Sequence, residues 1–149
     1  MRIGVRGSKL ALAYAEQAIK AIGQGEIEVI QTDGDLNPET PIHEIGGKGV
    51  FCNAIEYALA EGIIDVGVHS LKDMPGDVEH PDLHVCAVLE RNSYHDVLIG
   101  EVKDNFVLGT SSPRRTAQLK QHYENQFVEI KPIRGNIDTR LAKLDAGEY

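Results

Sequence analysis

The sequence is poor in cysteine, and its two cysteines follow no metal-binding pattern. Cys52 and Cys86 stand apart, without the Cys-x-x-Cys or Cys/His spacing of a zinc site, so no metal is expected. Each lies within an apolar pattern, one helical and the other strand-like. We therefore expect both to be free thiols in the core of a protein from a reducing compartment.

Long apolar runs and a basic excess are missing as well. No stretch approaches the roughly 20 apolar residues of a membrane-spanning helix, and the chain opens on a strand without the charged and apolar regions of a secretory signal. A cytoplasmic protein with no membrane contact is expected. The net charge of -8 argues against nucleic-acid binding, because proteins that bind the phosphate backbone show a basic excess or stripe. A local arginine cluster can still bind a small anion.

The hydrophobic pattern of the chain predicts an α/β fold. With 149 residues, 42% of them hydrophobic, the chain can bury a core in one domain or two small ones. The first part reads β-α-β-α-β, with a structureless stretch over 31–49. A polar passage at 90–96 marks a hinge and divides the chain into units 1–94 and 95–149. Strands are predicted at 1–5, 27–30, 63–68, 83–89, 97–99, 106–108 and 127–130, and helices after Ser8, from Val50 to Gly62, after Ser112 and after Asn136.

The first unit is organised around the apolar, β-branched run 63–68, which predicts a buried strand. A polar group follows it directly: His69, Ser70, Lys72 and Asp73. In open α/β sheets ligands bind beyond the carboxyl ends of the strands, so an acid, a base and a hydroxyl at this place are a candidate site. The alternative is a solvated turn, since most polar loops are simply surface.

Three strand ends lead through a short turn into a helix that carries arginine at its start. The turns are Arg6-Gly7-Ser8, Gly109 to Arg115, and Ile133 to Asn136 with Arg140 one turn further. Ser112 and Pro113 predict a helix start, where Arg114 and Arg115 oppose the helix dipole unless an anion binds there. Plain capping with solvated arginines is the alternative. Five arginines at three such junctions favour anion sites.

The glycine-rich segment around Lys48 is not a nucleotide-binding loop. Ile42 stands where a Walker motif needs glycine, and Gly49 stands where it needs serine or threonine. A nucleotide-triphosphate site is therefore not expected.

Taken in order, these motifs resemble those of the porphobilinogen deaminase (hydroxymethylbilane synthase) family of tetrapyrrole biosynthesis. The resemblance covers essentially the whole chain. It implies two periplasmic-binding-protein-like α/β lobes around a cleft, with mixed sheets flanked by helices, and a third domain that carries a cysteine-linked dipyrromethane cofactor. The matching segments are Arg6 to Leu12, Gly46 to Phe51, Val68 to Pro75, Leu108 to Arg115, Ile133 to Asn136, and Thr139 with Arg140.

The resemblance also implies an activity and its residues. Asp73 would be the catalytic carboxylate of a transferase that deaminates porphobilinogen and joins four units head to tail into hydroxymethylbilane. Lys72 would contact the acidic side chains of the cofactor. The residues that would hold the carboxylates of porphobilinogen, dipyrromethane and the growing pyrrole chain are Arg6, Ser8, Lys48, Ser70, Lys72, Thr110, Ser111, Ser112, Arg114, Arg115, Arg134, Gly135, Asn136 and Arg140.

Compared with the family, the chain ends early, at Tyr149. The second lobe is expected to be truncated, the third domain and the cofactor-bearing cysteine to be absent, and residues 1–149 alone to be inactive. The full-length form is expected to be a monomer, whereas exposed strand edges favour self-association of the fragment. Pro113 departs from the family, which usually has an apolar residue such as leucine there.

A different class of function fits some of the same features. A non-catalytic, two-lobed module that binds an acidic small molecule would account for the paired anion sites and the hinge. It leaves Asp73 unexplained, because a carboxylate among anion contacts repels the ligand unless it does catalytic or cation-stabilising work.

Overall fold

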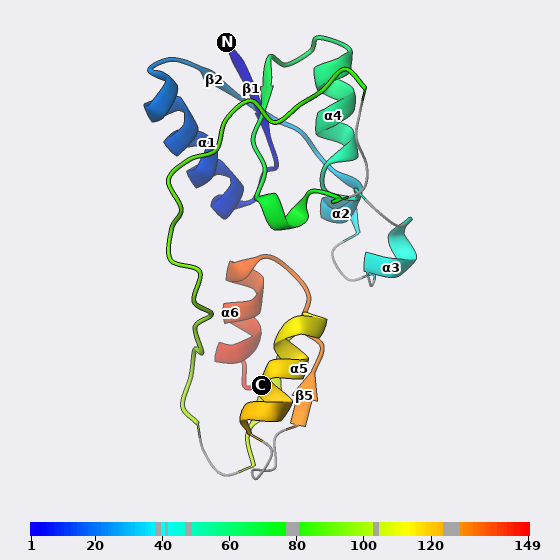
Figure 1. Cartoon of the computed structure of the whole chain (residues 1–149). Helices are drawn as coiled ribbons and strands as arrows, with labels where there is room; N and C mark the ends of the chain where they lie inside the picture. Colours follow the sequence, from blue (N-terminus) through cyan, green and yellow to red (C-terminus); the bar gives the residue numbers. More distant parts are fainter. Residues whose placement is uncertain (38–39, 41, 47–48, 77–80, 103–104, 124–128) are drawn as a thin grey trace. The chain divides into compact units, whose positions relative to one another are not determined.

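In a computed structural model, the chain forms two compact units, Met1–Asn92 and Ser93–Tyr149 (Figure 1). The structure describes all residues except 38–39, 41, 47–48, 77–80, 103–104 and 124–128. Each unit contains a parallel sheet flanked by helices, which makes the fold α/β. The described strand pairs are all parallel, whereas mixed sheets were expected from the sequence. No helix in the described part of the chain has the length and apolar character needed to cross a membrane.

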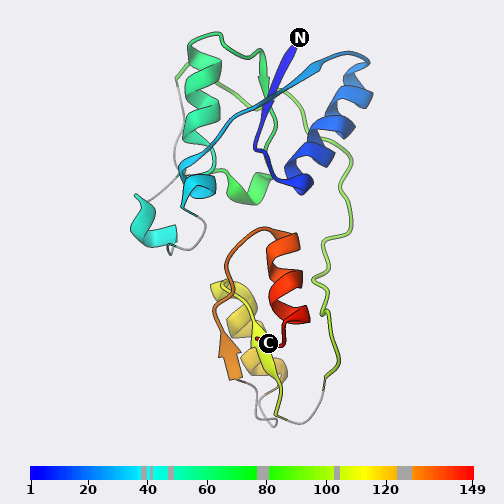
Figure 2. The same ribbon diagram turned by 180° about the vertical axis from the view of Figure 1, so that it is seen from behind.

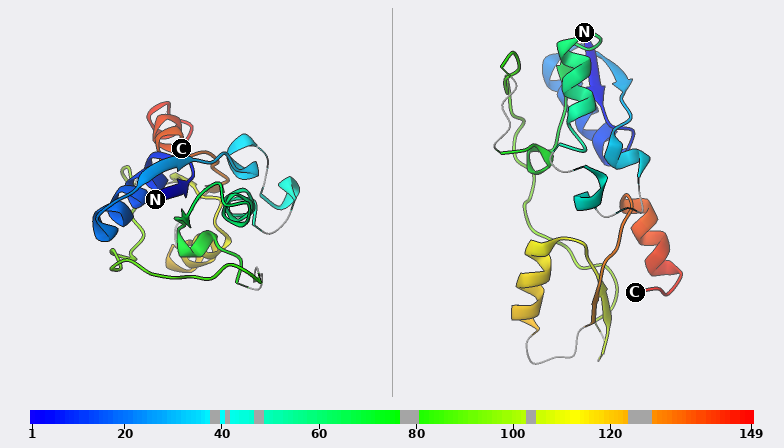
Figure 3. Two further views of the ribbon diagram at one scale, coloured as in Figure 1. Left: turned by 90° about the horizontal axis from the view of Figure 1, so that it is seen from above. Right: turned by 90° about the vertical axis from the view of Figure 1, so that its right-hand side faces the viewer.

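The first unit is built on a three-stranded sheet in the order β2-β1-β3. Strand β1 (Arg2–Val5) pairs with β2 (Glu26–Val29) on one side and with β3 (Val66–Gly67) on the other. The connection from β1 to β2 and the connection from β2 to β3 cross the sheet in opposite directions. Right-handed connections of opposite direction place their helices on opposite faces of the sheet. Figure 3 shows this arrangement, with α1 (Lys9–Ile22) on one face and α4 (Asn53–Ala60) on the other.

Helix α1 begins and ends where local chemistry predicts. The Ser8 hydroxyl accepts a hydrogen bond from the Ala11 backbone N–H at 3.3 Å, which caps the helix start. Gly23 ends the helix in the left-handed conformation, with φ of 89°, where a side chain would be strained. The predicted start of this helix after Ser8 is confirmed.

Two apolar clusters fill the two faces of the sheet. On the α1 face, Ile3, Val5 and Ala15 are buried, and on the α4 face Ile55, Ala58 and Ile64 are buried. The alternation of side chains along β1 and the helical spacing on α1 and α4 bring these residues together. Of the predicted buried strand 63–68, only Val66–Gly67 pairs in the sheet, and Ile63 is 51% exposed.

The stretch 31–49, predicted to lack structure, contains two short helices. These are α2 (Asp33–Leu36) and α3 (Ile42–Ile45). Helix α4 begins at Asn53, later than the predicted Val50. The cause is a turn in which the backbone N–H groups of Cys52 and Asn53 both bond to Gly49 O, at 2.7 and 2.8 Å.

Two predicted strands, 83–89 and 97–99, do not form. Neither segment has regular secondary structure, and no described residue pairs with them. Their β-branched composition favours strands, yet a strand needs a partner ladder as well as propensity. Val88 and Val97 are consequently 80% and 81% exposed. Cys86 is free, as expected, but it is exposed in this segment, so its predicted place in the core is wrong.

The second unit contains a two-stranded parallel sheet. Strand β4 (Val107–Gly109) leads to α5 (Pro113–His122), and β5 (Glu129–Lys131) leads to α6 (Ile137–Asp145). The two strands lie side by side in Figure 2 and pair in register from Val107 with Glu129. The Ser112 hydroxyl accepts from the Arg115 backbone N–H, and Pro113 occupies the first turn, so the predicted start of α5 is confirmed.

Candidate functional site

The carboxyl edge of the first sheet brings together two of the sequence motifs. Strand β1 ends at Val5 and is followed by Arg6, while β3 ends at Gly67 and is followed shortly by His69 and Ser70. The chain order reverses between these neighbouring strands, because the connections from β1 and β2 run in opposite directions. Such a switch point is where open α/β sheets bind ligands.

Arg6 is held by Asp35, a residue of α2. The Arg6 Nε lies 3.2 and 3.1 Å from the two Asp35 carboxylate oxygens, and the Arg6 Nη2 also donates to Oδ1. Thr32 donates its hydroxyl to Asp35 Oδ2 at 2.8 Å. Burial raises the pKa of Asp35, but the hydrogen bonds from Arg6 and Thr32 outweigh it and leave the pKa below the usual value. The carboxylate is therefore ionised at neutral pH.

The ring of Phe51 lies against the same guanidinium. The Arg6 Cζ is 4.1 Å from the ring centroid, close enough for a cation–π contact. Gly34 of α2 also lies against the Phe51 ring. A Cβ at this position would collide with the Phe51 ring atoms, so only glycine fits here. Gly34 thus leaves room for the Phe51 ring, and the ring in turn covers the Arg6 guanidinium.

Asp73 lies in a short 3-10 turn, Leu71–Asp73, directly after β3. Its backbone N–H bonds to Ser70 O at 2.9 Å, and its backbone carbonyl accepts the Cys52 thiol at 3.2 Å. Burial, with smaller contributions from the charges of Glu56 and Asp73, raises the pKa of Cys52 to about 11. The thiol therefore stays protonated and able to donate. The turn that carries Asp73 is tied in this way to the start of α4.

His69 lies beside the same turn. Burial lowers the pKa of its imidazole below the ordinary 6.5, while the charges of Glu56 and Asp73 act in the opposite direction. The positive charge of Arg6 also lowers it. His69 thus lies within electrostatic reach of both Arg6 and Asp73 at the carboxyl edge of the sheet.

The second unit repeats the arrangement at its own sheet edge. After β4 come Thr110, Ser111 and Ser112, and after β5 comes Ile133 with the Arg134 turn. The Ser111 hydroxyl donates to Ile133 O at 2.8 Å, which joins the two turns. Thr110 is buried, and its hydroxyl accepts from the Ser112 backbone N–H at 3.2 Å. Thr110, Ser111 and Ser112, which all carry hydroxyl groups, therefore lie together at the carboxyl edge of the second sheet.

Three guanidinium groups gather at this edge. Burial lowers the pKa of Arg140, and the charges of Arg115 and Arg134 lower it further. Arg140 Nε donates to Gly135 O at 2.7 Å. The Nε atoms of Arg115 and Arg134 are buried without a hydrogen-bond partner among the described residues. Like charges that repel one another and buried donors without acceptors are the features of an anion site.

Asp96 supplies one negative charge to this cluster. Its two carboxylate oxygens accept from Arg114 Nη1 at 3.1 Å and from Arg115 Nη2 at 2.7 Å. Hydrogen bonds from Arg115, and next from Arg114, lower the pKa of Asp96 to about 2. Asp96 thus occupies one side of each guanidinium.

We expect the Asp96 carboxyl carbon to titrate in NMR with a midpoint near 2 in the folded protein, below its ordinary 3.8. The folded-state pKa is depressed, so the stabilisation from this ion pair is complete above the unfolded pKa and is lost as pH falls through the folded one. Arg115→Gln should move the midpoint upward. A midpoint near the ordinary value in the parent would show that the ion pair does not form in solution.

Comparison with known proteins places the whole chain in one family. The family model described as porphobilinogen deaminase, dipyrromethane cofactor binding domain, matches residues 1–149. The chain belongs to the porphobilinogen deaminase family. It is 42% identical over 160 residues to a porphobilinogen deaminase of Acidothermus cellulolyticus and 45% identical over 159 residues to a probable porphobilinogen deaminase of Methanocaldococcus jannaschii. All of this chain is covered, and 47% and 53% of those relatives, so the chain spans about half of their length.

In this porphobilinogen deaminase family member, the structure separates the sequence-predicted residues into three groups. Asp73 and Ser70 are half-buried at the first sheet edge beside Arg6, while Lys72 in the same turn is exposed. Ser8 faces the start of α1, where its hydroxyl acts as the helix cap. The second edge gathers Thr110, Ser111, Ser112, Arg114, Arg115, Arg134, Gly135, Asn136 and Arg140. Lys48 lies outside the described residues.

Sequence reasoning missed three contributors to these edges. Asp35 and Phe51 engage Arg6, and Asp96 engages Arg114 and Arg115. No motif pointed to Asp35 or Asp96, since each is one of many carboxylates in an acidic chain. Phe51 stands in a matching segment, but nothing local in the sequence connects it with Arg6.

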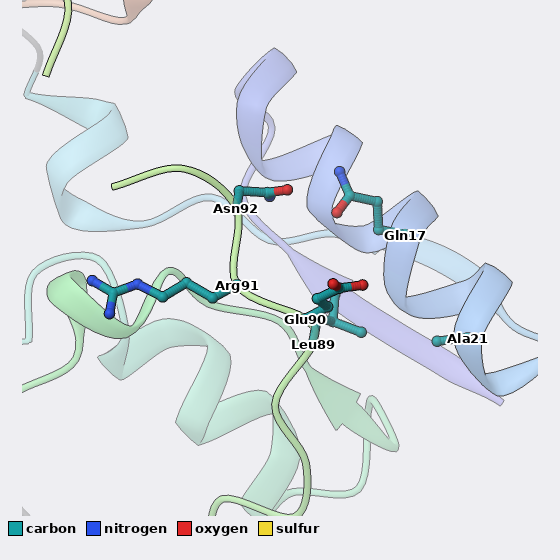
Figure 4. A pocket seen from close by; sticks show the side chains of 6 residues that line it. All are labelled: Gln17, Ala21, Leu89, Glu90, Arg91 and Asn92. Carbon is teal, nitrogen blue, oxygen red and sulfur yellow. The ribbon is translucent and has the colours of Figure 1, made fainter. Parts of the chain in front are cut away.

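A shallow depression of about 500 Å³ lies elsewhere on the first unit. It is lined by Gln17 and Ala21 of α1 and by residues 89–92. Figure 4 shows the Arg91 side chain extending away from α1. None of the sequence-predicted site residues of this family member lines the depression, so the chemistry is better sought at the two sheet edges.

Proposed function

We propose that this chain is part of an enzyme that deaminates porphobilinogen and joins four units head to tail into hydroxymethylbilane. The observation that carries the proposal is the place of Asp73. It lies in the turn after β3, beside Arg6 and His69, at the edge where α/β sheets bind ligands. Membership of the porphobilinogen deaminase family supports the choice of substrate.

Asp73 is suited to the chemistry that deamination requires. Loss of the amino group of porphobilinogen as ammonia leaves a cationic, electrophilic pyrrole. A carboxylate can transfer the proton that the departing amine needs and can stabilise the positive charge that develops. No described residue donates a hydrogen bond to the Asp73 carboxylate, and the backbone of its turn is held by Ser70 and Cys52. We propose Asp73 as the catalytic carboxylate.

The arginine-rich residues are proposed to hold the carboxylates of the substrate and of the growing pyrrole chain. Each pyrrole brings an acetate and a propionate group, so the negative charge grows with every unit added. Arginine suits this task because its planar fork binds carboxylates in pairs of hydrogen bonds and keeps its charge. The set comprises Arg6, Ser8, Lys48, Ser70, Lys72, Thr110, Ser111, Ser112, Arg114, Arg115, Arg134, Gly135, Asn136 and Arg140.

The second sheet edge fits a dipyrromethane group, whose side chains are carboxylates. The buried, unpartnered Nε atoms of Arg115 and Arg134 and the positive surroundings of Arg140 are what such an anion would neutralise. When bound, dipyrromethane supplies the pyrrole onto which the first porphobilinogen is joined. Arg115, Arg134 and Arg140 would hold its carboxylates, and Ser111 and Thr110 would shape the turns around them.

We also propose that the two units are lobes of the periplasmic-binding-protein type, divided near residue 94. Each unit has parallel strands whose carboxyl ends lead into polar turns, as that fold requires. The alternative function, a non-catalytic module for an acidic small molecule, receives no support from the family match or from the named relatives.

The direct test is to incubate the polypeptide, at the length at which the organism makes it, with porphobilinogen. Released ammonia and hydroxymethylbilane are both measured. Under the proposal, both appear, with four ammonia molecules for each product molecule. Binding of porphobilinogen without ammonia release would instead identify the non-catalytic module. If porphobilinogen is neither bound nor deaminated, it is not the substrate and the proposal is wrong.

A further inference from the structure

The Arg6–Asp35 ion pair uses one edge of the guanidinium. Only Nε and Nη2 of Arg6 contact the Asp35 carboxylate. No described residue forms a hydrogen bond with Nη1. Since a guanidinium carries five N–H donors in a fixed fork, it can bind a second carboxylate on the Nη1–Nη2 edge without releasing the first.

Asp35 is itself restrained. Thr32, which donates to Asp35 Oδ2, is only 1% exposed, so the donor is fixed within the fold. Phe51 covers one face of the Arg6 guanidinium. A guanidinium held on one edge and covered on one face has little freedom to rotate. The direction of its remaining edge is therefore set by Asp35.

We propose that Asp35 is a positioning residue, which holds Arg6 in the orientation that binds a carboxylate of the pyrrole substrate. The inference rests on the proposed function, because it takes porphobilinogen as the ligand of Arg6. Asp35 reduces the attraction of Arg6 for anions by partly neutralising it. An arginine that is already held in the binding orientation loses less conformational entropy when the ligand binds. For Asp35 to be a positioning residue, this entropic gain must exceed the loss of electrostatic attraction.

The chain offers a matched control at the opposite end of β1. Asp65 accepts from Arg2 Nη2 at 2.7 Å and from Arg2 Nε at 3.4 Å, which is the same use of one guanidinium edge. That pair lies at the amino end of the strand, away from the candidate site. Asp65→Asn thus removes a similar ion pair from the same strand without touching Arg6.

The experiment measures the Kd of porphobilinogen by titration calorimetry and its kcat and KM by ammonia release, on the native polypeptide. Asp35→Asn should raise Kd and KM about tenfold, the effect of disturbing one charged hydrogen bond, while kcat changes much less. Asp65→Asn should leave all three unchanged. An Asp35→Asn protein with unchanged or tighter binding would overturn the inference, tighter binding showing that Asp35 competes with the substrate.

A double-mutant cycle separates positioning from a structural role. If Asp35 acts through Arg6, the double variant Arg6→Lys with Asp35→Asn should bind as weakly as Arg6→Lys alone. Additive losses would show that Asp35 acts independently of Arg6 and would overturn the proposal.

A second variant is used if Asp35→Asn fails to fold, as judged by circular dichroism. Thr32→Val removes the hydrogen bond that restrains Asp35 and keeps the shape of residue 32. It should raise Kd by a smaller factor, and unchanged binding would count against the role.

The failures of the two proposals differ. A parent protein that neither binds nor converts porphobilinogen overturns both. A parent that binds and converts it, with the same constants after Asp35→Asn, overturns only the role of Asp35.

Discussion

Replacing Asp73 with asparagine is expected to slow ammonia release from porphobilinogen by a factor on the order of 10²–10⁴, the contribution of a general acid or base. Asparagine keeps the size of the side chain but cannot transfer the proton or neutralise the cationic pyrrole. The turn should persist, because its hydrogen bonds to Ser70 and Cys52 are made by the Asp73 backbone. We therefore expect an unchanged unfolding midpoint and unchanged circular dichroism.

The control for Asp73 is Asp33→Asn. Asp33 is an exposed carboxylate of α2, so its loss removes the same charge from the first unit without entering the proposed chemistry. Its turnover should match the parent. If Asp73→Asn forms hydroxymethylbilane at close to the parent rate, Asp73 is not the catalytic carboxylate.

Arg134→Ala should have the second-largest effect, on the binding of the polycarboxylate chain. A lost charged hydrogen bond costs about 1.5–3 kcal/mol, which corresponds to roughly 10- to 150-fold in affinity. Arg134 has a buried Nε without a described partner, so an anion would complete its hydrogen bonding. The measurement is the yield and rate of each chain-elongation step, resolved by mass spectrometry of the enzyme-bound pyrroles.

Arg114→Ala is the comparison for Arg134. The sequence alone predicts losses for both, but the Arg114 side chain is 61% exposed and already bonded to Asp96 and Gln118. Its removal should weaken elongation less, since an exposed ion pair contributes little. Equal effects of the two substitutions would mean that burial does not distinguish these arginines. Unaltered elongation in both would show that they are solvated surface.

Local signals account for the parts of the fold that the sequence predicts well. Ser8 and Gly23 bracket α1, and Ser112 with Pro113 starts α5, because caps act within one turn of helix. Burial along β1 follows from its apolar alternation. These features depend on residues that are close to one another in the chain, so they can be recognised from the sequence.

Features that depend on distant partners were not predictable in the same way. Segment 83–89 has strand composition but forms no ladder with the described residues, since pairing decides whether a strand forms. Arg6 could be recognised as a ligand residue from its turn, but not its bond to Asp35, 29 residues away. Likewise nothing local identified Asp96 as the partner of Arg114 and Arg115, which lie 18 and 19 residues further along.

The close approach of Gly34 to the Phe51 ring has a consequence for natural variation. Any side chain at position 34 would collide with the ring, and the ring lies against Arg6. These three positions therefore cannot change independently, although 45 positions separate the outermost two in the sequence. A homologue that retains the arginine and the aromatic ring should retain glycine at 34. One that has lost this glycine should carry a smaller residue at 51, and its arginine would then need another neighbour to keep it in place.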